Sequence, residues 1–97
     1  MDINTIIAEI EALIYQVKLL PLSEGEINSL TVKLEGAIEQ LSKNPPNIPP
    51  ACGKLKAFVN EVEALIRSNR LTVDEGQPLI DYANNIRTEL QCHQGEK

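Results

Sequence analysis

The sequence predicts an all-α protein, a four-helix bundle built from two repeated antiparallel helical hairpins. Apolar residues recur at steps of three and four in four successive stretches, which is the spacing of an amphipathic helix. The second half repeats the first, since residues 9–14 (EIEALI) return as 61–66 (EVEALI) and residues 20–25 (LPLSEG) return as 71–76 (LTVDEG). One hairpin cannot cover its own apolar stripe, whereas two hairpins can bury their stripes against each other.

The first hairpin is predicted over residues 3–43. Its first helix covers roughly residues 3–18 and ends before Pro21, which lacks the amide that a continuing helix needs. Ser23 and Glu26 have the spacing of a capping box, which begins the second helix. The apolar stripes of the two helices consist of Ile3, Ile6, Ile7, Ile10, Leu13, Ile14 and Val17, and of Ile27, Leu30, Leu34, Ala37, Ile38 and Leu41.

Residues 44–50 connect the two hairpins. Four of the six prolines lie in this segment, and a helix cannot continue through them because proline lacks the amide and clashes with the preceding turn. We therefore expect an extended and fairly stiff connection. The alternative interpretation of the same residues is a proline-rich recognition motif.

The second hairpin is predicted over residues 51–92. Its first helix, the third of the chain, starts at Pro50 or Ala51 and ends at residues 68–70, where Asn69 suits the left-handed position that follows many helices. The inward residues of this helix are Leu55, Phe58, Val59, Val62, Leu65 and Ile66.

Two overlapping capping signals can begin the fourth helix, Thr72 with Glu75 and Asp74 with Gln77. If the helix starts at Thr72, Pro78 falls in its second turn, where it should remove a hydrogen bond and bend the helix. The stripe of this helix consists of Leu79, Ile80, Ala83, Ile86 and Leu90.

Size and composition limit the possible functions. The 97 residues form one domain, residues 1–92, followed by a tail at residues 93–97 that is expected to fray. The net charge is -5 and the nine Lys and Arg are scattered along the chain, so nucleic-acid binding is not expected. No stretch approaches the roughly 20 apolar residues of a membrane span, and the first residues lack the basic region of a signal peptide. We therefore expect either a cytosolic protein or a module of a longer secreted chain.

No catalytic, cofactor-binding or metal-binding site is expected. The sequence contains no phosphate-binding loop, no nucleophile elbow and no zinc-binding helix motif. Cys52, Cys92 and His93 supply only three potential metal ligands, whereas structural zinc usually takes four. Carboxylates two residues apart, such as Glu9 and Glu11, do not face each other on a helix and are interpreted as solvated surface. The chain is therefore not expected to be an enzyme.

Cys52 and Cys92 are candidates for a disulfide. They open the third helix and close the fourth, so an antiparallel hairpin brings them together at its open end. The bridge would close a loop of about 40 residues and add roughly 4 kcal/mol of stability on the chain-entropy model. Two unrelated thiols are the alternative interpretation.

Tyr15 and Tyr82 are candidates for contact with a partner. Each lies at the edge of its apolar stripe, where tyrosine can bury its ring and keep its hydroxyl hydrated. Packing at the edge of the core is the simpler interpretation of both residues.

A further pattern covers the second half of the chain. It consists of Ala51-Cys52, Leu55, Ala57-Phe58-Val59-Asn60, Val62, Ala64-Leu65-Ile66, Leu71-Thr72, Glu75-Gly76, Leu79-Ile80, Ala83 and Ile86. The first half has a similar layout, with Leu30, Lys33-Leu34-Glu35 and Ala37. This pattern resembles the FIMAH domain, a C-terminal helical module of many secreted bacterial and archaeal proteins. The chain departs from that family at Asn69, where glycine is usual, and at the proline-rich connection, where a short polar turn is usual.

The resemblance implies an extracellular, non-catalytic accessory module and carries over no catalytic residues. We therefore predict an interaction module of a larger secreted or cell-surface prokaryotic protein, which mediates attachment or interdomain contact. Its partner is expected to be a protein or a cell-surface polymer, and the module itself a monomer or a weak homodimer without a cofactor. The alternative is a free-standing intracellular helical protein that binds a protein partner, as an adaptor or a phage-encoded inhibitor does. A small hydrolase would need a polar pocket, which the apolar stripes do not indicate.

Overall fold

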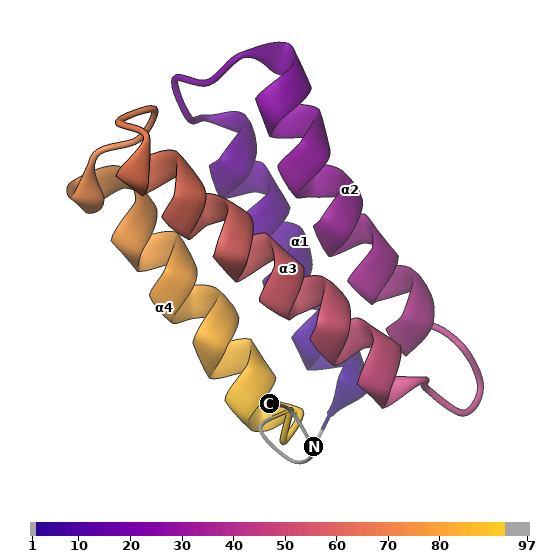
Figure 1. The fold of residues 1–97 in the computed structure, drawn as a ribbon. Helices are drawn as coiled ribbons and strands as arrows, with labels where there is room; N and C mark the ends of the chain where they lie inside the picture. Colours follow the sequence, from indigo (N-terminus) through magenta and orange to yellow (C-terminus); the bar gives the residue numbers. More distant parts are fainter. Residues whose placement is uncertain (1, 93–97) are drawn as a thin grey trace.

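The computed structural model describes residues 2–92, and over these residues the chain is an all-α four-helix bundle (Figure 1). The helices are α1 (Ile3–Lys18), α2 (Glu24–Leu41), α3 (Ile48–Arg67) and α4 (Val73–Glu89). Consecutive helices run antiparallel and form two hairpins side by side (Figure 1). The predicted fold class is therefore confirmed. The tail predicted at residues 93–97 lies outside the described residues.

The four helices form a closed ring. Each helix packs against its neighbours in the chain, and α1 completes the ring by packing against α4. The interface between α2 and α3 is the most extensive, so the two hairpins are joined along their inner helices. The contact between α1 and α4 is the least extensive of the four.

The core is aliphatic apart from one aromatic ring and the two buried cysteines, Cys52 and Cys92. Phe58 of α3 is fully buried and is the largest side chain in this core. The other large side chains that are fully buried are Ile10, Leu13, Leu30, Leu34, Leu41, Leu55, Ile86, Val17 and Val62. These residues come from all four predicted stripes, because side chains three and four positions apart lie on the same side of a helix.

Reciprocal hydrogen bonds determine where α2 and α4 begin. The Ser23 hydroxyl accepts from the Glu26 amide at 3.1 Å, and the Glu26 carboxylate accepts from the Ser23 amide at 3.0 Å. Thr72 and Glu75 form the same pair of bonds, at 3.0 and 2.9 Å. Of the two overlapping signals the structure therefore uses Thr72, and α4 continues through Pro78.

This choice of cap shifts α4 relative to the sequence repeat. Gly25 and Gly76 are equivalent in the repeat, but Gly25 is the second residue of α2 and Gly76 is the fourth residue of α4. Gly76 is buried, and a Cβ atom there would lie 2.6 Å from Ile66 Cδ1 of α3. A Cβ atom at Gly25 would meet nothing within 4 Å. Only the second glycine is therefore needed for helix packing.

Helix α3 begins at Ile48, earlier than the predicted start at residue 50 or 51. Pro49 and Pro50 lie in its first turn, where an amide has no acceptor within the helix and its absence costs nothing. The connection between the hairpins is correspondingly shorter than predicted. It also turns back on α2, since the Asn47 amide donates to a carbonyl of that helix at 2.9 Å.

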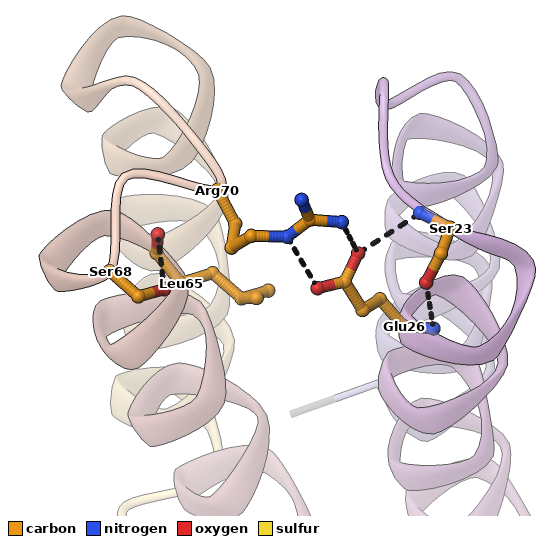
Figure 2. Close-up of polar contacts among 5 residues, drawn as sticks. All are labelled: Ser23, Glu26, Leu65, Ser68 and Arg70. Carbon is orange, nitrogen blue, oxygen red and sulfur yellow. Dashed lines mark hydrogen bonds and ion pairs between the residues drawn. The ribbon is translucent and has the colours of Figure 1, made fainter.

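The turns of the two hairpins are joined at one end of the bundle (Figure 2). Arg70, in the turn between α3 and α4, donates to the two carboxylate oxygens of Glu26 at 2.8 and 2.7 Å. The same carboxylate accepts from the Ser23 amide, so one side chain caps α2 and also binds the second hairpin. The hydrogen bonds from Arg70 and Ser23 lower the pKa of Glu26 to about 2.

Candidate functional sites

A disulfide joins the two candidate cysteines and closes the open end of the α3–α4 hairpin. The Cα atoms of Cys52 and Cys92 are 5.4 Å apart, within the range that a disulfide requires, and the residues are separated by 40 positions in the sequence. Both side chains are buried. The proximity predicted from the hairpin topology is confirmed, because the start of one antiparallel helix lies beside the end of the other.

A chain reversal after α4 positions Cys92. Gln91 adopts the left-handed conformation with a φ of 61°, its amide donates to the Thr88 carbonyl at 3.0 Å, and the Cys92 amide donates to the Arg87 carbonyl at 2.8 Å. These bonds form a Schellman motif. The end of α3 has the same motif, in which Asn69 has a φ of 64° as predicted. Glutamine is rare in this conformation, so nothing in the sequence marked Gln91.

A small acidic cleft lies between α1 and α4, with a volume of about 240 Å³. It is lined by Glu9, Tyr82, Asn85, Ile86 and Glu89. Glu9 Oε1 is buried and has no hydrogen-bond donor among the described residues. Burial raises the pKa of Glu9, and the neighbouring carboxylate of Glu89 raises it further.

The cleft is an acidic edge of the α1–α4 interface. Burial raises the pKa of Tyr82, and the charges of Glu9 and Glu89 add to this effect. Within residues 2–92, no group of three or more His, Cys, Asp and Glu side chains is placed to hold a metal ion.

The interpretation of Glu9 as solvated surface is wrong, because it is half-buried. Its pairing with Glu89 depends on the closure of α1 against α4, which no local pattern predicts.

The two candidate tyrosines lie on different surfaces. Tyr82 is half-buried and lines the acidic cleft. Tyr15 is 64% exposed and lies on the outside of α1. Packing at the edge of the core therefore describes Tyr82 but not Tyr15.

Tyr15 belongs to a second apolar stripe on α1, formed by Ala8, Ala12, Tyr15 and Leu19, which we call the outer stripe. All four side chains are exposed, and Leu19, the residue that caps α1, is 64% exposed like Tyr15. Steps of four, three and four residues place the four side chains on one face of the helix. At 3.6 residues per turn, this face points about 160° away from the core face of α1.

The other large apolar side chains that are exposed in the described part of the chain are isolated. Val32 on α2 is 52% exposed, and Val73 at the start of α4 is 59% exposed. The residues one turn away from Val32 include Asn28, Ser29 and Glu35, which are polar. The outer stripe is therefore the place where large exposed apolar side chains share a face.

Comparisons with known proteins found no match. No protein-family model fits the chain, and searches of curated proteins and of solved structures returned nothing. The resemblance to the FIMAH domain therefore stays a prediction. Within the described residues, none of the helices is long and apolar enough to cross a membrane.

Proposed function

We propose that the chain is a non-catalytic accessory module of a larger secreted or cell-surface prokaryotic protein, and that it binds another protein through the outer stripe of α1. The observation that carries this proposal is the 64% exposure of both Tyr15 and Leu19 on one face of one helix. The core of the bundle is complete without these side chains. An exposed apolar face that adds nothing to the core is typical of an interaction site.

The shape of the outer stripe favours a protein as the partner. The stripe lies on the convex surface of a helix, which cannot enclose a small molecule, whereas another helix can pack along it. Tyrosine is enriched at protein interfaces, because its ring buries a large area while its hydroxyl stays hydrated. The short side chains of Ala8 and Ala12 allow a partner to approach the α1 backbone closely.

The disulfide supports the secreted location. Bridges such as Cys52–Cys92 persist in oxidising compartments, and they are rare in the cytosol of most organisms. The bridge also anchors the end of α4 to the start of α3 without using the outer face of α1. The interaction surface and the structural restraint are therefore separate parts of the molecule.

The location is tested on the natural protein in cells that produce it. Cells are broken in an alkylating reagent, fractions are separated, and the mass of the protein is measured with and without reductant. We expect the protein outside the cytoplasm, with Cys52 and Cys92 alkylated only after reduction. Recovery from the cytoplasm with both thiols free would contradict the proposal and would favour the intracellular binding protein.

The binding surface is tested by photo-crosslinking in the same cells. The photoreactive residue p-benzoylphenylalanine replaces Tyr15 in one variant and Val73 in a control variant, since the two side chains are 64% and 59% exposed. We expect a crosslinked protein product from position 15 that is absent from position 73. Identical products from both positions, or none from position 15, would contradict binding through the outer stripe.

A further inference from the structure

The outer stripe is divided into a small half and a large half. Ala8 and Ala12 lie in its N-terminal part, and Tyr15 and Leu19 lie in its C-terminal part. The distance from Ala8 to Ala12 along the chain equals that from Tyr15 to Leu19. The stripe therefore has a raised end and a recessed end of matching length.

We propose that the outer stripe binds the outer stripe of a second copy of this chain, with the two α1 helices antiparallel about a two-fold axis. This inference rests on the proposed function, since it names the partner of the same surface. The axis passes midway between Ala12 and Tyr15. Tyr15 then packs over Ala12 of the second copy, and Leu19 packs over Ala8 of the second copy.

Each contact in this arrangement joins a large side chain to a small one. A two-fold interface uses the same surface on both copies, so every such contact is made twice. Steps of four and three residues are the spacing of the apolar seam in a two-stranded helical pair. A parallel pair would instead place Tyr15 beside Tyr15 and Ala12 beside Ala12. Two large side chains would then crowd one position of the seam, and two small side chains would leave another position poorly packed. The residue order therefore favours the antiparallel pair.

The charges beside the stripe are complementary in the same register. Glu11 and Lys18 are exposed, and both lie on the same flank of the outer stripe. Neither side chain takes part in the ion pairs found among the described residues, Lys33–Glu61 and Arg70–Glu26. In the antiparallel pair, residues on one flank of the stripe face residues on the same flank of the second copy, as in an antiparallel coiled coil. Glu11 then faces Lys18 of the second copy, and the symmetry repeats this pair.

The association is expected to be weak. Only four apolar side chains from each copy form the seam, so the buried area lies at or below the small end of the range for stable complexes. Dimers should therefore form in the range of roughly 10 µM to 1 mM, where a change in affinity is easy to measure. The disulfide joins α3 to the segment after α4 and lies outside the proposed contact.

The first test is sedimentation equilibrium of the purified, oxidised protein across this concentration range. The wild-type mass should rise from monomer towards dimer. Tyr15→Lys should weaken dimerisation at least about tenfold, because it places a charge in an apolar contact that occurs twice. Val73→Lys is the matched control at a similarly exposed position. Its average mass at each concentration should equal that of the wild-type protein. Thermal unfolding of each variant verifies that the bundle is intact.

The second test exchanges the flanking charges. Glu11→Lys and Lys18→Glu should each weaken dimerisation about threefold to tenfold, because each places like charges together at two symmetric positions. The double variant, with both exchanges, should restore wild-type affinity. High salt should reduce the effects of both single exchanges.

Three results would overturn the proposal. These are a monomer at every concentration, equal effects of Tyr15→Lys and Val73→Lys, and a double charge exchange that fails to restore affinity. The failure of self-association can be distinguished from failure of the proposed function. If the purified protein is monomeric but position 15 still crosslinks to a different protein in cells, the outer stripe is a binding site for that protein and not for a second copy.

Discussion

Loss of the disulfide is the perturbation whose cost follows most directly from the structure. Replacing both cysteines, Cys52→Ala with Cys92→Ala, opens a loop with a sequence separation of 40 residues. On the chain-entropy model the unfolded chain then gains about 13 cal/mol/K, which corresponds to about 4 kcal/mol at 25 °C. Alanine is the suitable replacement because the two side chains are 5% and 3% exposed, and a serine hydroxyl would have to be buried there.

A loss of this size is large for a single small domain, whose total stability is expected to be about 5–15 kcal/mol. The midpoint of thermal unfolding should fall by about 15–30 °C, at about 4–8 °C for each kcal/mol. The assay is urea unfolding followed by far-UV circular dichroism, which yields the free energy of unfolding and its dependence on urea. The free energy of unfolding of the wild-type protein in the presence of reductant should approach that of the double variant.

The single variants are the decisive controls. Cys52→Ala and Cys92→Ala should each lose nearly as much stability as the double variant, because removal of either sulfur opens the same loop. A loss below about 1 kcal/mol in the double variant, with an unchanged dependence on urea, would refute the reasoning. The unfolded chain would then not be the state that the bridge restricts.

Further predictions concern single positions. Gly76→Ala should lower the free energy of unfolding by about 1 kcal/mol, because its Cβ atom would lie 2.6 Å from a side-chain atom of α3, whereas Gly25→Ala, which meets open space, should not lower it. Equal urea midpoints for these two variants would contradict this account of the packing. Gln91→Gly should raise the free energy of unfolding by about 1 kcal/mol, since glycine adopts positive φ without strain, and a lower thermal midpoint would count against it. Glu9→Gln should raise the thermal midpoint at neutral pH but leave it unchanged below pH 4.5, the ordinary pKa of a glutamate. Folding raises the pKa of Glu9, so the ionised carboxylate lowers the stability of the folded protein as the pH rises from 4.5 to neutral, and glutamine cannot ionise. Thermal midpoints of dilute protein, measured from below pH 4.5 to neutral pH, test this prediction. Glu11→Gln, on the exposed face of α1, is the matched control and should not show the same rise at neutral pH.

Local features of the sequence predicted the helices well. The buried faces follow from the spacing of three and four, and the Ser23–Glu26 and Thr72–Glu75 boxes occur where capping signals were recognised. The start of α3 was predicted too late, because prolines were interpreted as a connection although the first helical turn tolerates them. The cysteine pair was within reach of the sequence, because hairpin topology alone places residues 52 and 92 at the same end.

The outer stripe was only partly visible in the sequence. Tyr15 was recognised as a candidate for partner contact, but it was assigned to the edge of the inner stripe of α1. At 3.6 residues per turn, Tyr15 lies on the face of the helix opposite Ile10 and Leu13, so the helical spacing already places it away from the inner stripe. The structure buries the face with Ile10 and Leu13 and leaves Tyr15 exposed.

The sequence by itself determined the four helices, the capping box that begins α2 and the proximity of the two cysteines, because each depends on residues a few positions apart or on hairpin geometry. Only the tertiary structure decided which of the two capping signals begins α4, which repeated glycine is packed, and that Glu9 meets Glu89. These features depend on how α1 closes against α4 and how closely α4 approaches α3. Such contacts join residues distant in the chain, and the relative position of packed helices is set by many side chains together rather than by any local pattern.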